Sequence, residues 1–206
     1  MAVYYKMSEN PSIKYHVQTD KSQCYTYDNY LPDEYSEYLF SECQKLTLLK
    51  NPPIKIFGKV CYQKRSVGFF SNVSQGYKYS GQMLKSQPLP PSLLNLMESV
   101  NESLETDFNG ILINLYSDGN DSIGFHSDSE KDLAKNGEVA SITLGQGRTF
   151  KIRSKSANIP EISLQTHDGQ LLVMAGNFQK EFTHGIPAET HVDKPRYSLT
   201  FRRHLA

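Results

Sequence analysis

The stretch NLYSDGNDSIGFHSDSE, residues 114–130, decides how the chain is interpreted. It contains His126 and Asp128, and on an extended backbone side chains at i and i+2 point to the same face. Both can therefore reach one metal ion. His184, from a distant strand, would complete a triad of two histidines and one carboxylate, which is typical of non-haem Fe(II) oxygenases. An isolated H-x-D is also common as a surface hydrogen-bonding pair, so the motif needs support from elsewhere.

The C-terminal stretch RYSLTFR, residues 196–202, alternates polar and apolar side chains, as a strand does. One face of this predicted strand carries Arg196, Ser198, Thr200 and Arg202. Such a face either meets solvent or lines a cavity, where two guanidinium groups suit a small dicarboxylate. Asn114 and Tyr116 repeat the alternation on another predicted strand. Together with the triad, these faces predict an iron ion and a dicarboxylate in one cavity.

The rest of the chain predicts a mainly β domain with N-terminal helices. Short apolar or alternating runs, separated by turn residues, cover 111–116, 139–144, 149–153, 170–174 and 196–203. Many short strands of this kind indicate a sandwich, barrel or jelly roll. Apolar residues at helical spacing predict helices over 33–46 and, after Pro91-Ser92, over 93–104. Residues 1–27 have no clear period, which predicts a tail or an added edge.

Composition limits the class of protein. The chain has 206 residues, of which 38% are hydrophobic and 21% charged, as expected for one globular domain. The longest apolar run, 171–175, is too short to span a membrane, and the start lacks the apolar segment of a secretory signal. Three widely spaced cysteines form no CxxC pair. We therefore expect an intracellular protein of a reducing compartment, the nucleus or cytoplasm.

The net charge is zero, with 22 basic and 22 acidic residues, but the charges are unevenly distributed. Between Glu42 and Glu98 there are eight lysines and arginines and no acid. Aromatic residues are interleaved with them, which suits phosphate contacts and base stacking. The same composition also fits core aromatics beneath a solvated lysine face.

These motifs resemble those of the AlkB-type Fe(II)/2-oxoglutarate-dependent dioxygenases. Residues 114–130 are similar to the family's N-x-Y-x-x-G…H-x-D-x-[DE] signature, and residues 141–153 to the hairpin that follows it. Three further stretches resemble its closing strands: 169–176, 178–184 and 196–202. Upstream, residues 57–59 and 77–81 resemble the nucleotide-recognition lid of the eukaryotic nucleic-acid-repair branch.

The resemblance implies a double-stranded β-helix, or jelly roll, over 109–204, behind an N-terminal extension over 28–108 that carries the lid, in one domain over 1–206. It implies oxidative demethylation of alkylated bases in DNA or RNA with Fe(II), O2 and 2-oxoglutarate, which releases formaldehyde, succinate and CO2. No membrane partner or oligomer is indicated.

The resemblance also implies roles for individual residues. The iron ligands would be His126, Asp128 and His184. Arg196, with help from Tyr116, would bind the distal carboxylate of 2-oxoglutarate, and Asn114 and Arg202 would lie nearer its C1 end. The remaining co-substrate positions on the closing strand are Ser198 and Thr200. The family usually has asparagine at the position of Ser198, where the shorter side chain is expected to alter co-substrate affinity.

Six residues are candidates for contact with the substrate. Because the chain has no tryptophan, base stacking must use Tyr, Phe or His. Tyr77 and Tyr79 match the lid motif and are the candidates for stacking on bases. Glu130 is two residues after Asp128, so on an extended backbone it shares its face, and it is the candidate for substrate specificity. The alternative is that Glu130 is an ordinary surface acid beside Lys131. Arg148 resembles a family arginine near the substrate, with a solvated strand arginine as the alternative. The candidates for phosphate contact are Lys64 and Arg65.

Other functions remain open at this point. A dioxygenase of the same fold could act on a protein or a small molecule, and it would not need the basic, aromatic segment. A non-catalytic nucleic-acid-binding module would not need the complete triad. A zinc hydrolase could use the same triad, but it would leave Arg196 and Arg202 unexplained.

Overall fold

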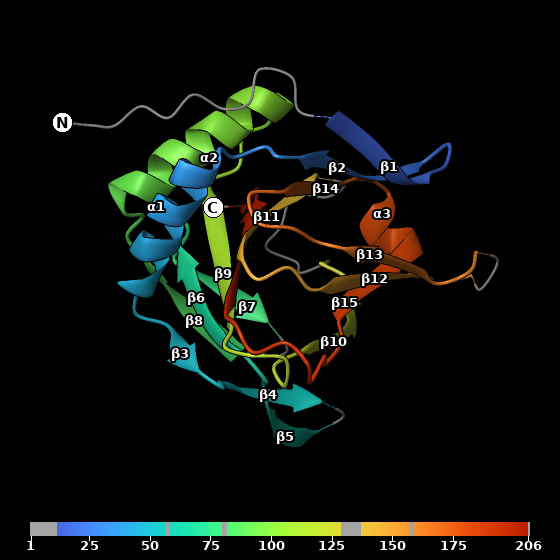
Figure 1. Cartoon of the computed structure of the whole chain (residues 1–206). Coiled ribbons are helices and arrows are strands. Elements are labelled where there is room, and N and C mark those ends of the chain that lie inside the picture. The colour runs from blue at the N-terminus through green and yellow to red at the C-terminus, as the bar shows by residue number, and fades with distance from the viewer. Residues whose placement is uncertain (1–11, 57, 80–81, 129–136, 157–158, 206) are drawn as a thin grey trace.

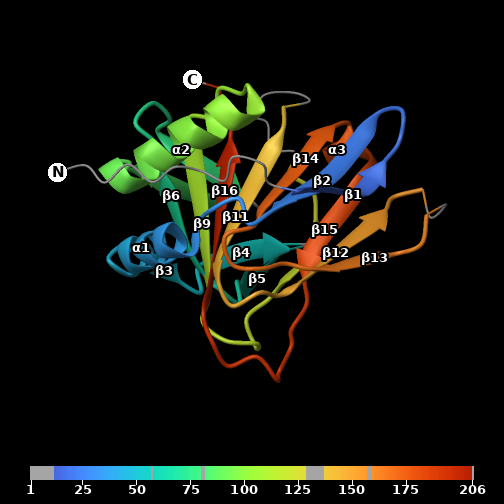
Figure 2. The same cartoon turned by 45° about the horizontal axis from the view of Figure 1, so that its top comes forward.

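A computed structural model of the chain describes residues 12–56, 58–79, 82–128, 137–156 and 159–205. Two helices, α1 (Asp33–Gln44) and α2 (Pro91–Leu104), lie together on one side of a large sheet (Figure 1). Viewed after a 45° turn, they cover the sheet on the side away from the C-terminal strands β12, β13 and β15 (Figure 2). No helix in the described part of the chain is long and apolar enough to cross a membrane.

The large sheet has ten strands in the order β1-β2-β14-β11-β16-β9-β6-β8-β7, with β3 beside β6. Its pairs are antiparallel except β6 with β8. The strands from its first edge to its centre are β1 (Ser12–Gln18), β2 (Ser22–Asp28), β14 (Leu171–Gly176), β11 (Val139–Gly145) and β16 (Arg196–Arg202). The others are β9 (Gly110–Tyr116), β6 (Ser66–Phe70), β8 (Gln82–Gln87), β7 (Gly76–Tyr79) and β3 (Leu49–Lys50).

A smaller sheet of four strands packs against the large one. Its order is β10 (Ile123–His126), β15 (Phe182–Ile186), β12 (Thr149–Ser154) and β13 (Ile162–Gln165). A short helix, α3 (Phe178–Glu181), precedes β15. A separate hairpin is formed by β4 (Pro53–Ile56) and β5 (Lys59–Tyr62). Two sheets packed in this way form the jelly roll that the sequence predicts.

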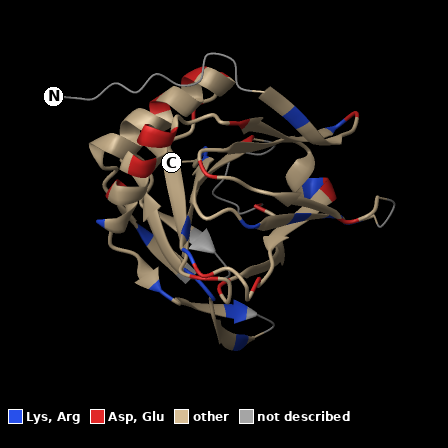
Figure 3. Cartoon of the chain, in the orientation of Figure 1, with Lys and Arg blue, Asp and Glu red and all other residues tan. Residues whose placement is uncertain are grey.

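The helices are amphipathic. Their outward positions carry acids, which appear as red bands in Figure 3. Their inward positions recur every three or four residues, as Leu93, Leu96 and Val100 show on α2. Pro91 is the first residue of α2, where its missing N–H costs no helical hydrogen bond. Asp33 and Glu34 lie in the first turn of α1, where their negative charges interact favourably with the positive end of the helix dipole.

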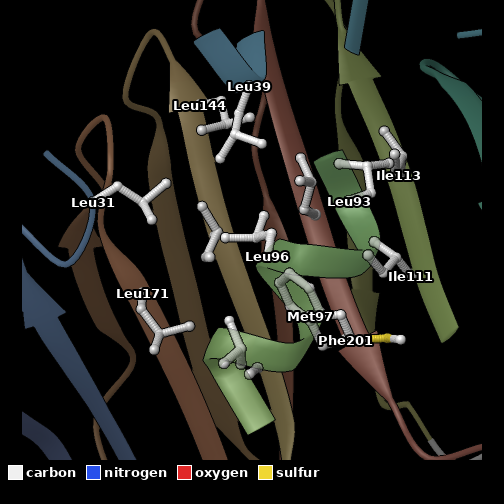
Figure 4. Close-up of a cluster of buried hydrophobic side chains, with 14 of the residues drawn as sticks. Leu31, Leu39, Leu93, Leu96, Met97, Ile111, Ile113, Leu144, Leu171 and Phe201 are labelled. Carbon is white, nitrogen blue, oxygen red and sulfur yellow. The ribbon is translucent and has the colours of Figure 1, made fainter. Parts of the chain in front are cut away.

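The main core lies between these helices and one face of the large sheet (Figure 4). Leu96 and Met97 of α2 meet Ile111 of β9 and Phe201 of β16 in this layer. A second apolar cluster joins the sheets to each other, and it includes Leu172, Met174, Phe150, Phe178 and Phe182. The first core is thus separated from the space between the sheets by the large sheet itself.

The predictions of helices and major strands are confirmed, with ends shifted by a few residues. Within residues 1–27, expected to form a tail or an added edge, β1 and most of β2 lie at the edge of the large sheet. Residues 1–11 lie outside the described part. The sequence placed His126 and His184 on strands, but it did not give the bounds of β10 and β15, which are short and contain glycine, and it did not predict β13. These strands build most of the smaller sheet.

Candidate active site

Two adjacent strands of the smaller sheet bring the predicted metal ligands together. His126 on β10 pairs directly with His184 on β15, and their rings are 4.4 Å apart. The Nε2 atom of each histidine lies 3.7 Å from one carboxylate oxygen of Asp128. One ligand atom from each residue lies within 4.8 Å of the others. The three side chains can therefore hold a single ion.

Asp128 reaches this position differently from the prediction. Strand β10 ends at His126, so Asp128 is in the following segment and not on a shared strand face. Its backbone N–H donates to Gln179 Oε1 at 2.9 Å, and the hydroxyl of Ser127 donates to the carbonyl of Phe182 at 2.8 Å. These bonds to α3 and β15 orient the carboxylate toward the histidines.

The surroundings keep each ligand in its metal-binding form. Burial lowers the pKa of His184 to about 3 and also lowers the pKa of His126, so both imidazoles are neutral near pH 7. Phe150 stacks on His184, with the ring centroids 5.3 Å apart. Burial opposes ionisation of Asp128, but the charge and hydrogen bond of Arg202 outweigh it, with help from the two histidines where they are protonated, and the pKa of that carboxyl lies far below its usual range.

The polar face of β16 lines a cavity and does not meet solvent. All seven residues of β16 are buried, on both faces of the strand. The cavity has a volume of about 160 Å³ and also contains the triad. The predicted co-substrate residues that line it are Arg196, Ser198, Thr200 and Arg202 from β16 and Asn114 and Tyr116 from β9. The alternation therefore reflects an internal polar wall opposite the helix core.

Arg196 is a buried cation with room for an anion beside it. Its Nη2 donates to Thr143 Oγ1 at 3.0 Å, and its guanidinium lies 5.4 Å from the centre of the Tyr116 ring. Within the described part of the chain, no hydrogen-bond partner is found for Nε or Nη1. Burial lowers the pKa of Arg196 to about 10. Buried donors without partners fit a carboxylate that bonds both of them.

Arg202 contacts the metal-ligand side of the cavity. Its Nη2 lies 2.7 Å from Asp128 Oδ1, and its guanidinium lies 5.1 Å from the centre of the Tyr77 ring. Ser198, in the middle of the same strand, forms a 2.9 Å hydrogen bond with the hydroxyl of Ser141 on β11. Arg202 thus pairs with the ligand carboxylate, and Ser198 is already engaged by a neighbouring strand.

The predicted substrate residues lie in different environments. Lys64 is exposed, whereas Arg65 next to it is 5% exposed and lines the cavity. Tyr77 also lines the cavity, but it is buried against Phe69 and the guanidinium of Arg202, so its ring is not a free stacking surface. Glu130 and the side chain of Tyr79 lie outside the described residues.

The structure corrects the prediction for Arg148. Its side chain is completely buried and does not line the cavity. Its Nε donates to Glu189 Oε2 at 2.8 Å, and its other nitrogens donate to the carbonyls of Asp118, Asp121 and Pro187. Because these partners occupy the guanidinium, Arg148 joins two loops behind the cavity wall. Neither a substrate contact nor a solvated strand arginine describes it.

Several residues of the site were not predicted. They are Gln179, which bonds the backbone of Asp128, Phe150, which packs on His184, and Thr143 and Ser141, which bond the polar face of β16. Gln179 follows the phenylalanine of the FQKEFTH stretch, so its proximity to His184 in sequence was a usable signal. The two β11 hydroxyls alternate with apolar residues, and that pattern was visible as well.

Comparisons with known proteins agree with this geometry. The sequence matches the 2OG-Fe(II) oxygenase superfamily over residues 23–202. It is 33% identical over 159 residues to DNA oxidative demethylase ALKBH2 of Bos taurus, which covers 74% of this chain and 57% of the relative. It is also 33% identical over 135 residues to alpha-ketoglutarate-dependent dioxygenase alkB homolog 3 of Mus musculus, which covers 60% of this chain and 47% of the relative.

The chain spans between 57% and 66% of the length of the ALKBH2 relatives from Bos taurus, Homo sapiens and Mus musculus. The solved structure of OsALKBH1 superposes with a TM-score of 0.60 and 16% sequence identity, over 93% of this chain and 100% of that one. That likeness concerns the fold. With the match over residues 23–202 and the triad in its cavity, the chain belongs to the 2OG-Fe(II) oxygenase superfamily, where it is similar to the AlkB-type members.

Proposed function

We propose that the protein is an oxidative demethylase of alkylated bases in DNA or RNA. It uses Fe(II), O2 and 2-oxoglutarate and releases formaldehyde, succinate and CO2. The observation that carries the proposal is one cavity that contains both the His-Asp-His triad and the buried Arg196, whose Nε and Nη1 nitrogens have no partner among the described residues. The name DNA oxidative demethylase, printed for the ALKBH2 relatives, supports the substrate class.

The residues present fit both groups that the family uses. Two neutral imidazoles and one carboxylate are the donor set preferred by non-haem Fe(II), and they leave coordination positions free. The unmet donors of Arg196 fit the distal carboxylate of 2-oxoglutarate. When bound, the iron and co-substrate supply the oxidation of a C–H bond by O2.

The chain's own residues hold, orient and shield these groups. Arg202 holds the carboxylate of Asp128, and Gln179 accepts a hydrogen bond from its backbone N–H. Phe150 packs on His184 and helps to exclude water from the ligand. The Tyr116 ring lies near two guanidinium groups, with its centre 5.4 Å from that of Arg196 and 5.8 Å from that of Arg148. The protein therefore contributes a cavity with held side chains in which the reacting carbon can be placed.

The reaction transfers one oxygen atom to an N-methyl carbon and the other to the carboxylate of succinate, as CO2 leaves 2-oxoglutarate. The resulting N–CH2OH group loses its C–N bond and releases formaldehyde, and the base nitrogen recovers its proton. A base must leave its stack to reach the cavity, which costs least for a damaged or single-stranded base.

The mouth of the cavity suits such a base. Leu49, Pro52 and Met83 line it with apolar side chains. Beside it, the β4–β5 hairpin and the next segment carry exposed lysines at 55, 59 and 64. In Figure 3 blue segments mark Lys and Arg on β4 and β5, and also on β1 and α3, whereas α1 and α2 carry red bands. Cations beside an apolar opening support phosphate contacts around an extruded base.

We also propose that residues 28–108 serve as the substrate-recognition extension and 109–204 as the catalytic jelly roll of one domain. The extension is not structurally separate, because β6 pairs with β9 inside the large sheet. The three cysteines are free thiols, which supports a reducing intracellular compartment.

The test is mass spectrometry of N-methylated DNA and RNA oligonucleotides, incubated in parallel with the protein, Fe(II) and 2-oxoglutarate. We expect loss of one methylene mass, equimolar succinate, and no reaction with Asp128→Asn. Succinate formation without change in any oligonucleotide would refute the nucleic-acid substrate and favour a protein or small-molecule substrate for the same fold.

A further inference from the structure

Lys64 and Arg65 are neighbours in sequence, but one is at the surface near the mouth and the other lines the cavity. Both were expected to contact phosphate. Lys64 is exposed, but Arg65 is 5% exposed and its side chain enters the cavity that holds the triad. A backbone phosphate outside the mouth cannot approach a guanidinium that is buried to this extent. Arg65 therefore needs a different explanation.

The sheet places Arg65 beside a predicted co-substrate residue. Arg65 immediately precedes β6, and Val67 of β6 pairs with Asn114 of β9. The Nε of Arg65 donates to Asn114 Oδ1 at 2.8 Å, and both residues are buried. On the other side of β9, Asn114 pairs with Ser198 of β16. An arginine of the N-terminal extension thus contacts the polar wall of the catalytic cavity.

This hydrogen bond determines which end of the Asn114 amide faces which way. A guanidinium has only donors, whereas an amide has one acceptor oxygen and one donor nitrogen. With Oδ1 turned to Arg65, the Nδ2 end remains as a donor in the cavity that Asn114 lines. A half-turn of the amide would oppose two donors at Arg65 and present an acceptor to the cavity. An acceptor there would repel a carboxylate.

The residue opposite Asn114 offers a shorter polar group. Ser198 pairs with Asn114 across β9 and β16, and its hydroxyl shares a 2.9 Å hydrogen bond with Ser141. In this row of the cavity wall, the amide of Asn114 is therefore the longer polar side chain, and the direction of its donor matters for an anion bound there.

We propose that Arg65 is a positioning residue for 2-oxoglutarate, which orients the Asn114 amide so that its Nδ2 donor meets a carboxylate of the co-substrate. This inference rests on the proposed use of 2-oxoglutarate. It assigns part of the N-terminal extension to co-substrate binding, whereas the neighbouring Lys64 is exposed and does not line the cavity.

The test measures 2-oxoglutarate binding directly, by isothermal titration of protein loaded with Mn(II) in place of Fe(II). Arg65→Met is compared with Lys64→Met, a matched loss of the neighbouring charge. Hydrogen bonds to charged groups suggest that Arg65→Met weakens 2-oxoglutarate binding by about tenfold to a hundredfold. Lys64→Met should leave it unchanged. Equal affinity of Arg65→Met and wild type would overturn the inference.

A double-mutant cycle separates positioning from a direct effect of charge. If Arg65 acts through the amide, Arg65→Met adds little to the loss caused by Asn114→Ala. Additive losses would show that the guanidinium acts on the co-substrate itself and would reject the positioning role.

Asn114→Asp keeps a partner for Arg65 and is expected to fold even if Arg65→Met does not. It offers no donor to the cavity, so it should bind 2-oxoglutarate at least as poorly as Arg65→Met, and wild-type affinity would refute the assignment of the donor. If the wild-type protein itself bound no 2-oxoglutarate, the proposed function would fail together with this inference. Normal wild-type binding with an unaffected Arg65→Met would remove this inference alone.

Discussion

Replacing Arg196 with methionine should stabilise the ligand-free protein and abolish its response to 2-oxoglutarate. Arg196 is a buried cation whose only described hydrogen bond runs from Nη2 to Thr143 Oγ1. Methionine fills a similar length with apolar, adaptable atoms. Replacing a buried charge with a well-packed apolar side chain is often neutral or stabilising, because the charge no longer has to be removed from water.

The size of the effect follows from the burial of the guanidinium. The fall in the pKa of Arg196 from its ordinary 12.5 to about 10 corresponds to roughly 3 kcal/mol by which burial disfavours the charged form. Loss of the bond to Thr143 subtracts about 1 kcal/mol. The variant should therefore be about 2 kcal/mol more stable without ligand. With ligand at a hundred times its Kd, the wild type should gain about 2.7 kcal/mol and the variant nothing.

The assay is urea unfolding near pH 7.5, followed by circular dichroism, with and without Mn(II) and 2-oxoglutarate. Arg153→Met serves as the control, because Arg153 is an exposed arginine paired with Glu161. It should change neither the stability of the ligand-free protein nor the stabilisation by 2-oxoglutarate. The reasoning is refuted if ligand-free Arg196→Met is less stable than the wild type. It is equally refuted if 2-oxoglutarate still stabilises the variant.

Three further outcomes are expected. His184→Ala and Asp128→Asn should each lose bound Mn(II) on dialysis while remaining folded, since two ligands hold such an ion poorly; unchanged metal content would reject the ligand assignment. As the pH falls from 6.5 to 4, the free energy of unfolding of the wild type should decrease by up to about 3 kcal/mol more than that of His204→Phe. Urea titrations of both proteins at each pH measure this difference. Burial and then Arg202 lower the pKa of His204 from 6.5 to about 4, so only the unfolded chain takes up the proton in that range. Lys64→Ala should reduce the slope of log affinity for an oligonucleotide against log salt by about 0.7–0.9, measured by fluorescence anisotropy; an unchanged slope would exclude a phosphate contact.

The helices and the major strands could be predicted because each has a regular period in sequence. Leu93, Leu96 and Val100 repeat at helical spacing, and Arg196, Ser198 and the residues after them alternate as a strand. The alternation could not show whether the polar face meets water or a cavity. That depends on whether another sheet covers it, and the sequences of the short strands β10 and β15 do not show which face of the large sheet they pack against.

The two arginines whose environment differs from the prediction show where sequence reasoning stopped. Arg65 bonds a residue 49 positions away, and Arg148 bonds one 41 positions away. An arginine in a polar stretch has the same local pattern whether it meets a phosphate, an amide or a buried carboxylate. The metal ligands could be found because their spacing matches a known signature, whereas the supporting contacts depend on partners that only folding brings near.

The same strands serve stability on one face and chemistry on the other. On β9 and β16, Ile113 and Leu199 point to the helix core, while Asn114 and Ser198 point to the cavity. Because side chains alternate with a period of two, each requirement falls on its own set of residues. The apolar face can therefore offset the unfavourable burial of a cation such as Arg196 on the opposite face. A buried cation is unfavourable by itself, and an anion that binds beside it removes that cost. The nitrogens of Arg196 that have no partner in the described part of the chain therefore favour a carboxylate ligand in the cavity, such as one end of a dicarboxylate.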